Sequence, residues 1–127
     1  EIHKLINLKI INISNNIIKD LPRGLFNLNN LEELYCYGNQ ITSIPPQIQN
    51  LNKLVNLDLY NNLIDTIPAE IGKLTNLIEF DLLKNRLISL PVEICDLVLL
   101  RRLRISENRI KKIPNQCAWM NSVIIWK

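Results

Sequence analysis

Carboxylates and tyrosines are the side chains of this 127-residue chain whose types and spacing could do chemistry. The acids are Glu33, Asp58, Glu79 and Asp81, and Tyr35, Tyr37 and Tyr60 stand among them. Two carboxylates could act as a general acid and a general base, but this needs a pocket that separates their pKa values. Because His3 is the only histidine, no histidine-based triad or two-histidine metal site can be built. We therefore expect no enzyme, catalytic residue, metal or cofactor.

Basic side chains gather towards the C-terminus. They are Arg101, Arg102, Arg104, Arg109, Lys111 and Lys112. The formal net charge is only +3, and the nearby acids would repel phosphate. We therefore expect a mixed-charge surface rather than a nucleic-acid interface.

Composition indicates one ordinary folded domain, since 47% of the residues are hydrophobic and 21% are charged. The longest uninterrupted apolar runs, such as 123–126, are far too short to cross a bilayer, so we expect no membrane span and a soluble protein. Glu1 is not a methionine, which suggests a processed chain or part of a longer one. Cys36, Cys95 and Cys117 are scattered without a CxxC pair, and we expect reduced thiols in a cytoplasmic protein.

An internal repeat organises the whole chain. Asparagines recur at one constant spacing, and prolines follow in register. The asparagines are Asn16, Asn39, Asn62, Asn85 and Asn108, and the prolines are Pro22, Pro45, Pro68, Pro91 and Pro114. Apolar columns keep the same period, one of them formed by Ile11, Leu34, Leu57, Phe80, Leu103 and Trp126. Each unit reads LxxLxLxxNxIxxIPxxIxxLxx.

This unit resembles the leucine-rich repeat family over the whole chain. The nearest subclass is the 23-residue type with the segment IPxxIxxL, found in intracellular signalling scaffolds that bind Ras-like GTPases. The resemblance implies an α/β fold, a right-handed solenoid with a parallel β-sheet on its concave face and 3₁₀ or short helical turns on its convex face. We expect a single domain at 1–127, with five full repeats and partial repeats at both ends.

The residues agree with this fold on physical grounds. Leu57 and Leu59 alternate with polar residues as in a strand, and Ile67, Ile71 and Leu74 recur every three to four residues as in a tight helical return. Burial in one repeat does not offset the entropy of ordering it, so the coils must stack.

The asparagines are expected to form a structural ladder. A coil that turns sharply after its strand leaves backbone N–H and C=O groups inside the solenoid, and a carboxamide offers donors and an acceptor for them. With only three glycines, Gly24, Gly38 and Gly72, we expect little left-handed backbone and corners shaped by proline and asparagine. The glycines are isolated, so no phosphate-binding glycine loop is expected either.

Neither end of the repeat array has a polar cap. Ile2, Leu5 and Leu8 start partway through a return segment, and 123–127 begins a sixth strand. Either flanking segments are missing or the ends contact another chain. Cys117 stands in the column of Ile94, followed by Trp119 and Met120; the alternatives are local repacking and an apolar contact surface.

The resemblance implies that outward-pointing strand residues on the concave face bind a partner. The candidates are Glu33, Tyr35, Tyr37, Asp58, Tyr60, Glu79, Asp81, Arg102 and Arg104. Tyrosine and arginine often dominate interface energetics. Either this face is an ordinary solvated surface, or it binds a protein with a basic or mixed patch that answers the clustered acids.

We expect a protein-binding recognition module or signalling scaffold, with a small GTPase or a phosphatase as the partner that the resemblance suggests. Two alternatives stay open. The chain could be a structural element that self-associates into a homo-oligomer through its uncapped ends, or the targeting or regulatory domain of a larger enzyme. Nothing in the sequence specifies the partner.

Overall fold

The computed structural model describes residue 1, residues 4–117, residue 119 and residues 123–126. Residues 124–126 are described by their backbone. The expectations for Ile2, His3, Met120 and Lys127 lie outside these residues.

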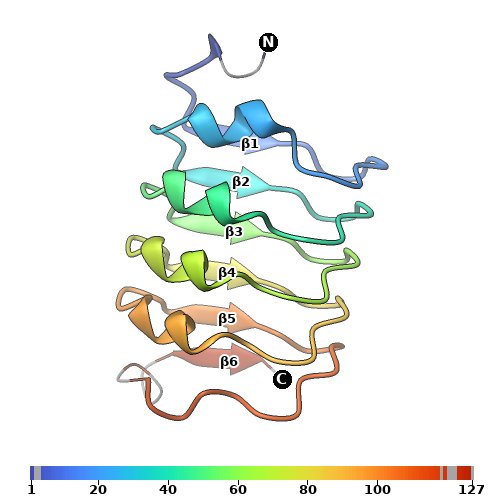
Figure 1. The fold of residues 1–127 in the computed structure, drawn as a ribbon, viewed down its shortest axis with the longest axis vertical. Helices are drawn as coiled ribbons and strands as arrows, with labels where there is room; N and C mark the ends of the chain where they lie inside the picture. The colour runs from blue at the N-terminus through green and yellow to red at the C-terminus, as the bar shows by residue number, and fades with distance from the viewer. Residues whose placement is uncertain (2–3, 118, 120–122, 127) are drawn as a thin grey trace.

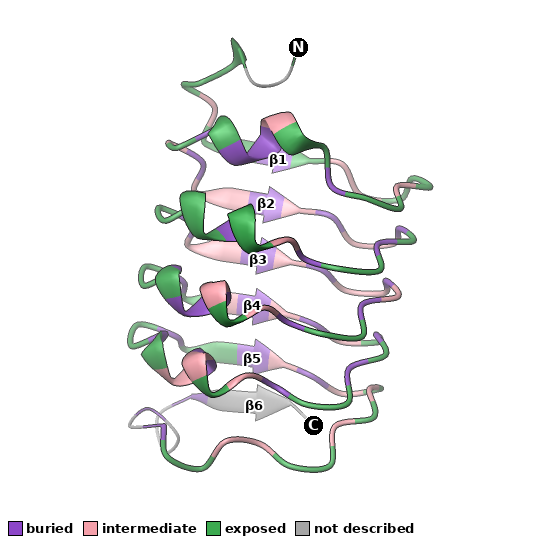
Figure 2. Ribbon diagram, viewed as in Figure 1, coloured by how far each residue is buried: buried purple, intermediate pink, exposed green. Residues whose placement is uncertain are grey.

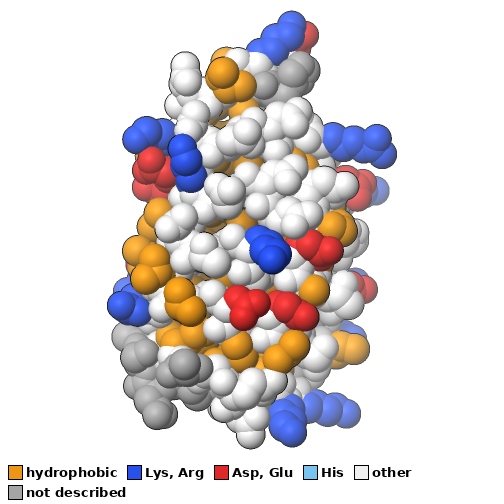
Figure 3. Space-filling model, turned by 60° about the vertical axis from the view of Figure 1, so that its left-hand side comes forward, with side chains coloured by type: hydrophobic (Ala, Val, Ile, Leu, Met, Phe, Trp, Pro, Cys, Tyr) orange, Lys and Arg blue, Asp and Glu red, His pale blue; other side chains and the backbone are white. Residues whose placement is uncertain are grey.

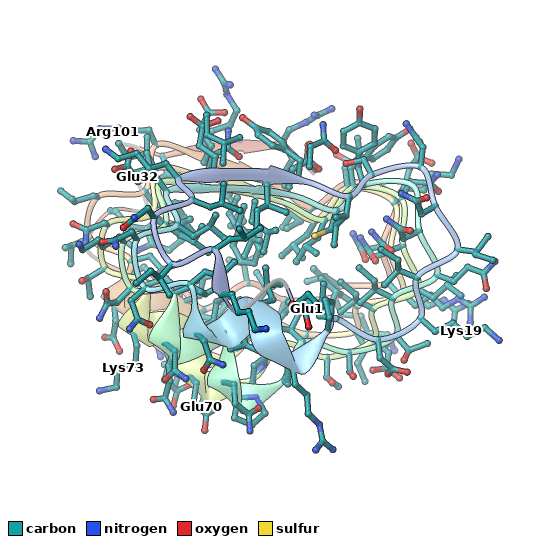
Figure 4. All side chains as sticks on the ribbon, turned by 90° about the horizontal axis from the view of Figure 1, so that it is seen from above. Glu1, Lys19, Glu32, Glu70, Lys73 and Arg101 are labelled. Atoms are coloured by element: carbon teal, nitrogen blue, oxygen red, sulfur yellow. A yellow bond between two sulfur atoms is a disulfide. The ribbon has the colours of Figure 1, made fainter. Side chains whose placement is uncertain are left out.

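Short strands and 3₁₀ helices alternate along the chain and stack into a solenoid (Figure 1). The strands are β1 (Ile10–Asn12), β2 (Glu33–Tyr35), β3 (Asn56–Asp58), β4 (Glu79–Asp81), β5 (Arg102–Arg104) and β6 (Ile124–Trp126). The 3₁₀ helices are η2 (Arg23–Asn27), η3 (Pro46–Asn50), η4 (Ala69–Lys73) and η5 (Val92–Asp96). The strands form one parallel sheet in sequence order, on the side opposite the 3₁₀ helices (Figure 4). The predicted leucine-rich repeat solenoid is confirmed. None of the described helices is long and apolar enough to cross a membrane.

The buried apolar residues form one continuous core, and buried positions lie on both the strands and the 3₁₀ helices (Figure 2). The middle residue of each of the strands β1 to β5 is buried, and its neighbours are exposed or half-buried. On the return, a proline precedes each 3₁₀ helix from η2 to η5 in an extended conformation. Its carbonyl accepts the first helical bond, for example from Ile71 N to Pro68 O at 3.1 Å.

The corner after each strand uses left-handed backbone at the residue before the repeated asparagine. These corner residues are Asn15, Gly38, Asn61, Lys84 and Glu107, with φ between 52° and 66°. The expectation of little left-handed backbone is therefore wrong. Only Gly38 adopts this conformation without a steric penalty, whereas Lys84 and Glu107 are held in it by the coils around them.

The asparagine carboxamides bridge successive coils at these corners. Asn62 Nδ2 donates to Cys36 O of the previous coil at 3.0 Å and to Leu59 O of its own coil at 3.2 Å. Its Oδ1 accepts from Ile41 N at 3.0 Å. Asn39, Asn85 and Asn108 repeat this pattern. We call these four residues the asparagine ladder.

Asn16 occupies the same position in the first coil but bonds only within that coil among the described residues. Its Nδ2 donates to Ile13 O and Ser14 O, both at 3.0 Å, and the residue is exposed. Asn16 therefore makes the hydrogen bonds within its own coil but, among the described residues, none to a preceding coil.

The last coil is one residue shorter than the sequence pattern predicts. Leu103 of β5 pairs with Ile125, and the next residue, Arg104, pairs with Trp126. The placement of Trp126 in the column of Leu103 is therefore wrong by one position. A one-residue change of register exchanges the two faces of a strand, so the period could not be extended through this coil.

The cysteines also differ from expectation. Cys95 and Cys117 form a disulfide, while Cys36 is free and buried. The prediction of reduced thiols is therefore wrong for two cysteines. The sequence separation of 22 residues is almost one coil, which brings Cys117 against η5.

The ladder predicts a position-dependent cost of replacing asparagine. Asn62→Ala should lower the free energy of unfolding by about 2–4 kcal/mol, because buried backbone groups at Cys36, Ile41 and Leu59 lose their partner. Asn16→Ala, the matched control, should cost much less. Urea unfolding measures both, and equal losses in the two variants would contradict a bridging role.

The corner geometry predicts that glycine stabilises one site and destabilises another. Lys84→Gly should raise the free energy of unfolding by about 0.5–1 kcal/mol, because glycine adopts a positive φ without steric cost. Lys73→Gly, in η4, should lower it by a similar amount. Thermal melts of both variants provide the comparison, and a destabilised Lys84→Gly protein would show that the corner is unstrained.

Candidate functional site

Seven of the nine predicted binding residues form two columns on the outer face of the sheet. Parallel pairing of each repeat with the next places equivalent positions beside one another on neighbouring strands. One column runs Glu33, Asn56, Glu79, Arg102, and the next runs Tyr35, Asp58, Asp81, Arg104. Tyr37 and Tyr60 follow β2 and β3, so all nine candidates lie on or directly beyond the strands from β2 to β5. We call these nine residues the sheet-face surface.

The tyrosines lie outside the core. Tyr35, Tyr37 and Tyr60 are each half-buried, as are the acids on their strands. Their sequence neighbours Leu34, Cys36 and Leu59 are fully buried. The sheet therefore presents the aromatic rings on its solvent side while the alternate residues fill the core.

Two arginines of β5 neutralise two acids of β4. Arg102 Nη1 lies 3.1 Å from Glu79 Oε1, and Arg104 Nη1 lies 2.5 Å from Asp81 Oδ2. The first pair is substantially exposed, whereas Asp81 is largely covered. The negative charge of the acidic cluster is therefore partly neutralised within the chain itself. This weakens the expectation that a partner must neutralise all four acids.

Tyr35 and Glu33 are joined within β2. The Tyr35 hydroxyl donates a hydrogen bond to Glu33 Oε2. This bond to a carboxylate, with smaller contributions from burial and nearby acids, raises the pKa of Tyr35 to about 12. The phenol is therefore neutral over the physiological range and is orientated along its own strand.

Asp58 is a partly buried carboxylate with a raised pKa. Burial and the neighbouring Asp81 raise its pKa, while a hydrogen bond from Tyr60 N to Oδ1 at 2.9 Å and the charge of Arg104 act in the opposite direction. None of the ion pairs found in the described part of the chain includes Asp58. The surface therefore holds a partly desolvated carboxylate beside Tyr35 and Tyr60.

The predicted basic cluster is divided between several regions. Arg102 and Arg104 lie on β5, but Arg101 precedes the strand on the flank that also carries Glu32 (Figure 4). Lys111 and Lys112 line a shallow depression beyond the carboxyl end of β5. The basic residues therefore do not form one continuous patch on the sheet.

Sequence reasoning missed the two ion pairs and the disulfide. The signal for the ion pairs was present, since Glu79 and Arg102 hold equivalent positions in successive repeats and so must be neighbours on adjacent strands. A signal for the disulfide was also present, since Cys117 stands in the column of Ile94, next to Cys95 one coil earlier.

Two further surface features lie away from the sheet face. On the convex side, a groove of about 710 Å³ between η2 and η3 is lined by residues that include Arg23, Phe26 and Gln47. On the flank, Ile78, Val98 and Leu99 are exposed in the segments that lead into β4 and β5, and Figure 3 shows apolar side chains gathered towards the C-terminal half.

Known structures share this architecture. A leucine-rich repeat protein of Leptospira interrogans is 33% identical, with a TM-score of 0.89 over 98% of this chain and 32% of the other. An internalin of Listeria monocytogenes is 26% identical, with a TM-score of 0.83 over 99% of this chain and 36% of the other. A plant peptide hormone receptor, RGFR1 in complex with RGF2, is 27% identical, with a TM-score of 0.83 over 97% of this chain and 20% of the other.

This chain thus spans about a third or less of the length of these proteins. A comparison with curated proteins gives no match. The model of a leucine-rich repeat region matches residues 1–87, which is more than half of the chain. Together with the stacked coils and the parallel sheet, this match shows that the chain belongs to the leucine-rich repeat family.

Proposed function

We propose that the chain is a protein-recognition module that binds its partner through the sheet-face surface. The observation that carries this proposal is the position of Tyr35, Tyr37 and Tyr60. These tyrosines stand on neighbouring coils, outside the core, beside a partly desolvated carboxylate. Tyrosine gives a rigid contact area with a polar tip at low entropic cost, which suits a binding surface.

The comparisons support a binding role in general terms. One of the similar structures is a plant peptide hormone receptor in complex with RGF2. That ligand belongs to the receptor, and the likeness supports the proposal that this chain also binds a partner.

The charge distribution suggests the chemistry of the partner. Arg102 and Arg104 already pair with Glu79 and Asp81, so the negative charge left on the sheet face is that of Glu33 and Asp58. A partner with a basic or mixed patch would place a cation near Asp58 and the tyrosine rings, where charge attraction and cation–π contact act together.

The finer assignments remain proposals. A scaffold role, a small GTPase or a phosphatase as partner, and a cytoplasmic location rest on resemblance to the intracellular subclass. The premise of reduced thiols, which favoured the cytoplasm, is wrong for Cys95 and Cys117. Self-association and a targeting role in a larger enzyme stay predictions.

Removing the tyrosines tests the binding role. The triple variant Tyr35→Ser, Tyr37→Ser and Tyr60→Ser should lose the proteins that the wild type captures from extract of its source cells, because the aromatic contact area is gone. Quantitative mass spectrometry of the captured proteins is the measurement, and circular dichroism checks that the variant is folded.

A matched triple variant on the convex side controls for general surface changes. Asn50→Ser, Lys73→Ser and Asp96→Ser replace exposed residues at one position of η3, η4 and η5. This variant should keep the captured proteins. If the tyrosine variant also keeps them, the sheet face is not the binding surface.

The raised pKa of Asp58 predicts a pH-dependent effect of neutralising it. The folded state favours the protonated carboxyl, so this group's contribution to stability is complete below its unfolded-state pKa of about 3.9 and is lost as pH rises through the raised value. Asp58→Asn keeps an oxygen for Tyr60 N and removes the charge. Urea unfolding should show the variant more stable than wild type at pH 7, with the gain shrinking towards pH 4. A gain that increases on acidification would contradict this assignment.

A further inference from the structure

The last coil differs from the others in how its return segment is held. In the coils from η2 to η5, a 3₁₀ helix follows the proline, and η3, η4 and η5 pack side by side. Residues 111–117 contain no such helix. This return segment therefore does not extend the stack of 3₁₀ helices.

A disulfide fixes this segment to the last 3₁₀ helix. It joins Cys117 of the return segment to Cys95 of η5, with the two Cα atoms 4.5 Å apart. Cys117 is buried, whereas Cys95 keeps part of its surface in solvent. A covalent link thus docks the return segment at the point where η–η packing ends.

What this coil covers is the edge of the sheet. β6 pairs with β5 on the side away from β4. In β5 and directly after it, Leu103 is fully buried and Ile105 is 4% exposed. If β6 separated from β5, then β5 would expose unpaired N–H and C=O groups and part of its core. Such an exposed edge strand can pair with a strand of another chain.

We propose that the Cys95–Cys117 disulfide is a redox-sensitive clasp. Oxidised, it holds the last coil and β6 on the edge of β5. Reduced, it lets this coil open and leaves β5 as the exposed edge. The clasp does not depend on the protein-binding role. Because disulfides persist in oxidising compartments, we expect the complete six-stranded sheet to be most stable there.

The chemistry of the clasp is thiol–disulfide exchange with a small-molecule disulfide such as oxidised glutathione. The thiolate of one cysteine attacks the reagent and releases one reduced thiol, and the second cysteine then attacks the mixed disulfide and releases another. One sulfur–sulfur bond forms in the protein as one breaks in the reagent, and two protons pass from the protein thiols to the released thiols. Dithiothreitol reverses the reaction.

Thiol labelling tests whether the clasp forms. After folding in a glutathione redox buffer, denaturation in iodoacetamide should add one label, at Cys36, and prior reduction should raise the number to three. Three labels without reduction would overturn the proposal.

Amide hydrogen exchange by mass spectrometry tests what the clasp does. Treating the native wild type with dithiothreitol should accelerate exchange in β6 on the order of 100-fold, because the loop constraint is removed, and should leave β3 unchanged. A change in β6 of less than about twofold would overturn the proposal.

The variant Cys95→Ser with Cys117→Ser separates the clasp from other effects of the reductant. Its β6 exchange should be fast from the start and should not respond to dithiothreitol. A response in this variant would overturn the assignment to this disulfide. Should the variant fail to fold, as judged by circular dichroism, the wild-type comparison decides alone.

Discussion

The structure depends on satisfying the backbone groups at the corner that follows each strand. The chain turns there through one left-handed residue and points N–H and C=O groups into the stack, where no strand partner exists. The carboxamide of the next residue supplies these partners, as Asn85 does by donating to Leu59 O and Leu82 O and accepting from Ile64 N. Since each amide bonds to two coils, it fixes the corner of its own coil and the stacking on the coil before it.

This constraint positions the sheet-face surface. With the corners fixed, equivalent residues of successive repeats lie side by side on neighbouring strands. Side chains far apart in sequence then meet in columns, and Arg104 reaches Asp81 because of it. The two ion pairs lie between β4 and β5, whereas Glu33 and Asp58 lie near the tyrosines without an arginine partner among the described residues. The charge on the sheet face is therefore distributed unevenly along the stack.

The sequence predicts the repeated part well because each coil repeats the same physical problem. The core columns, the sheet face and the bridging asparagines follow from the constant period of the repeat. The left-handed corners did not follow, because Lys84 and Glu107 are residues that seldom adopt a positive φ, and stacking overrides that preference. The last coil also escaped prediction, since β6 pairs with β5 one residue out of the register of the repeat and Cys117 bonds to Cys95.

The claim on which the account depends is that asparagine oxygens accept the buried corner N–H groups. Amide hydrogen exchange followed by NMR at Ile41 and Ile64, whose N–H groups donate to Asn62 and Asn85, tests this claim directly. The account predicts exchange at these two amides as slow as at Leu57 in the middle of β3. Exchange as fast as in exposed loops would show that the corners are open to water and that the coils are held together in another way.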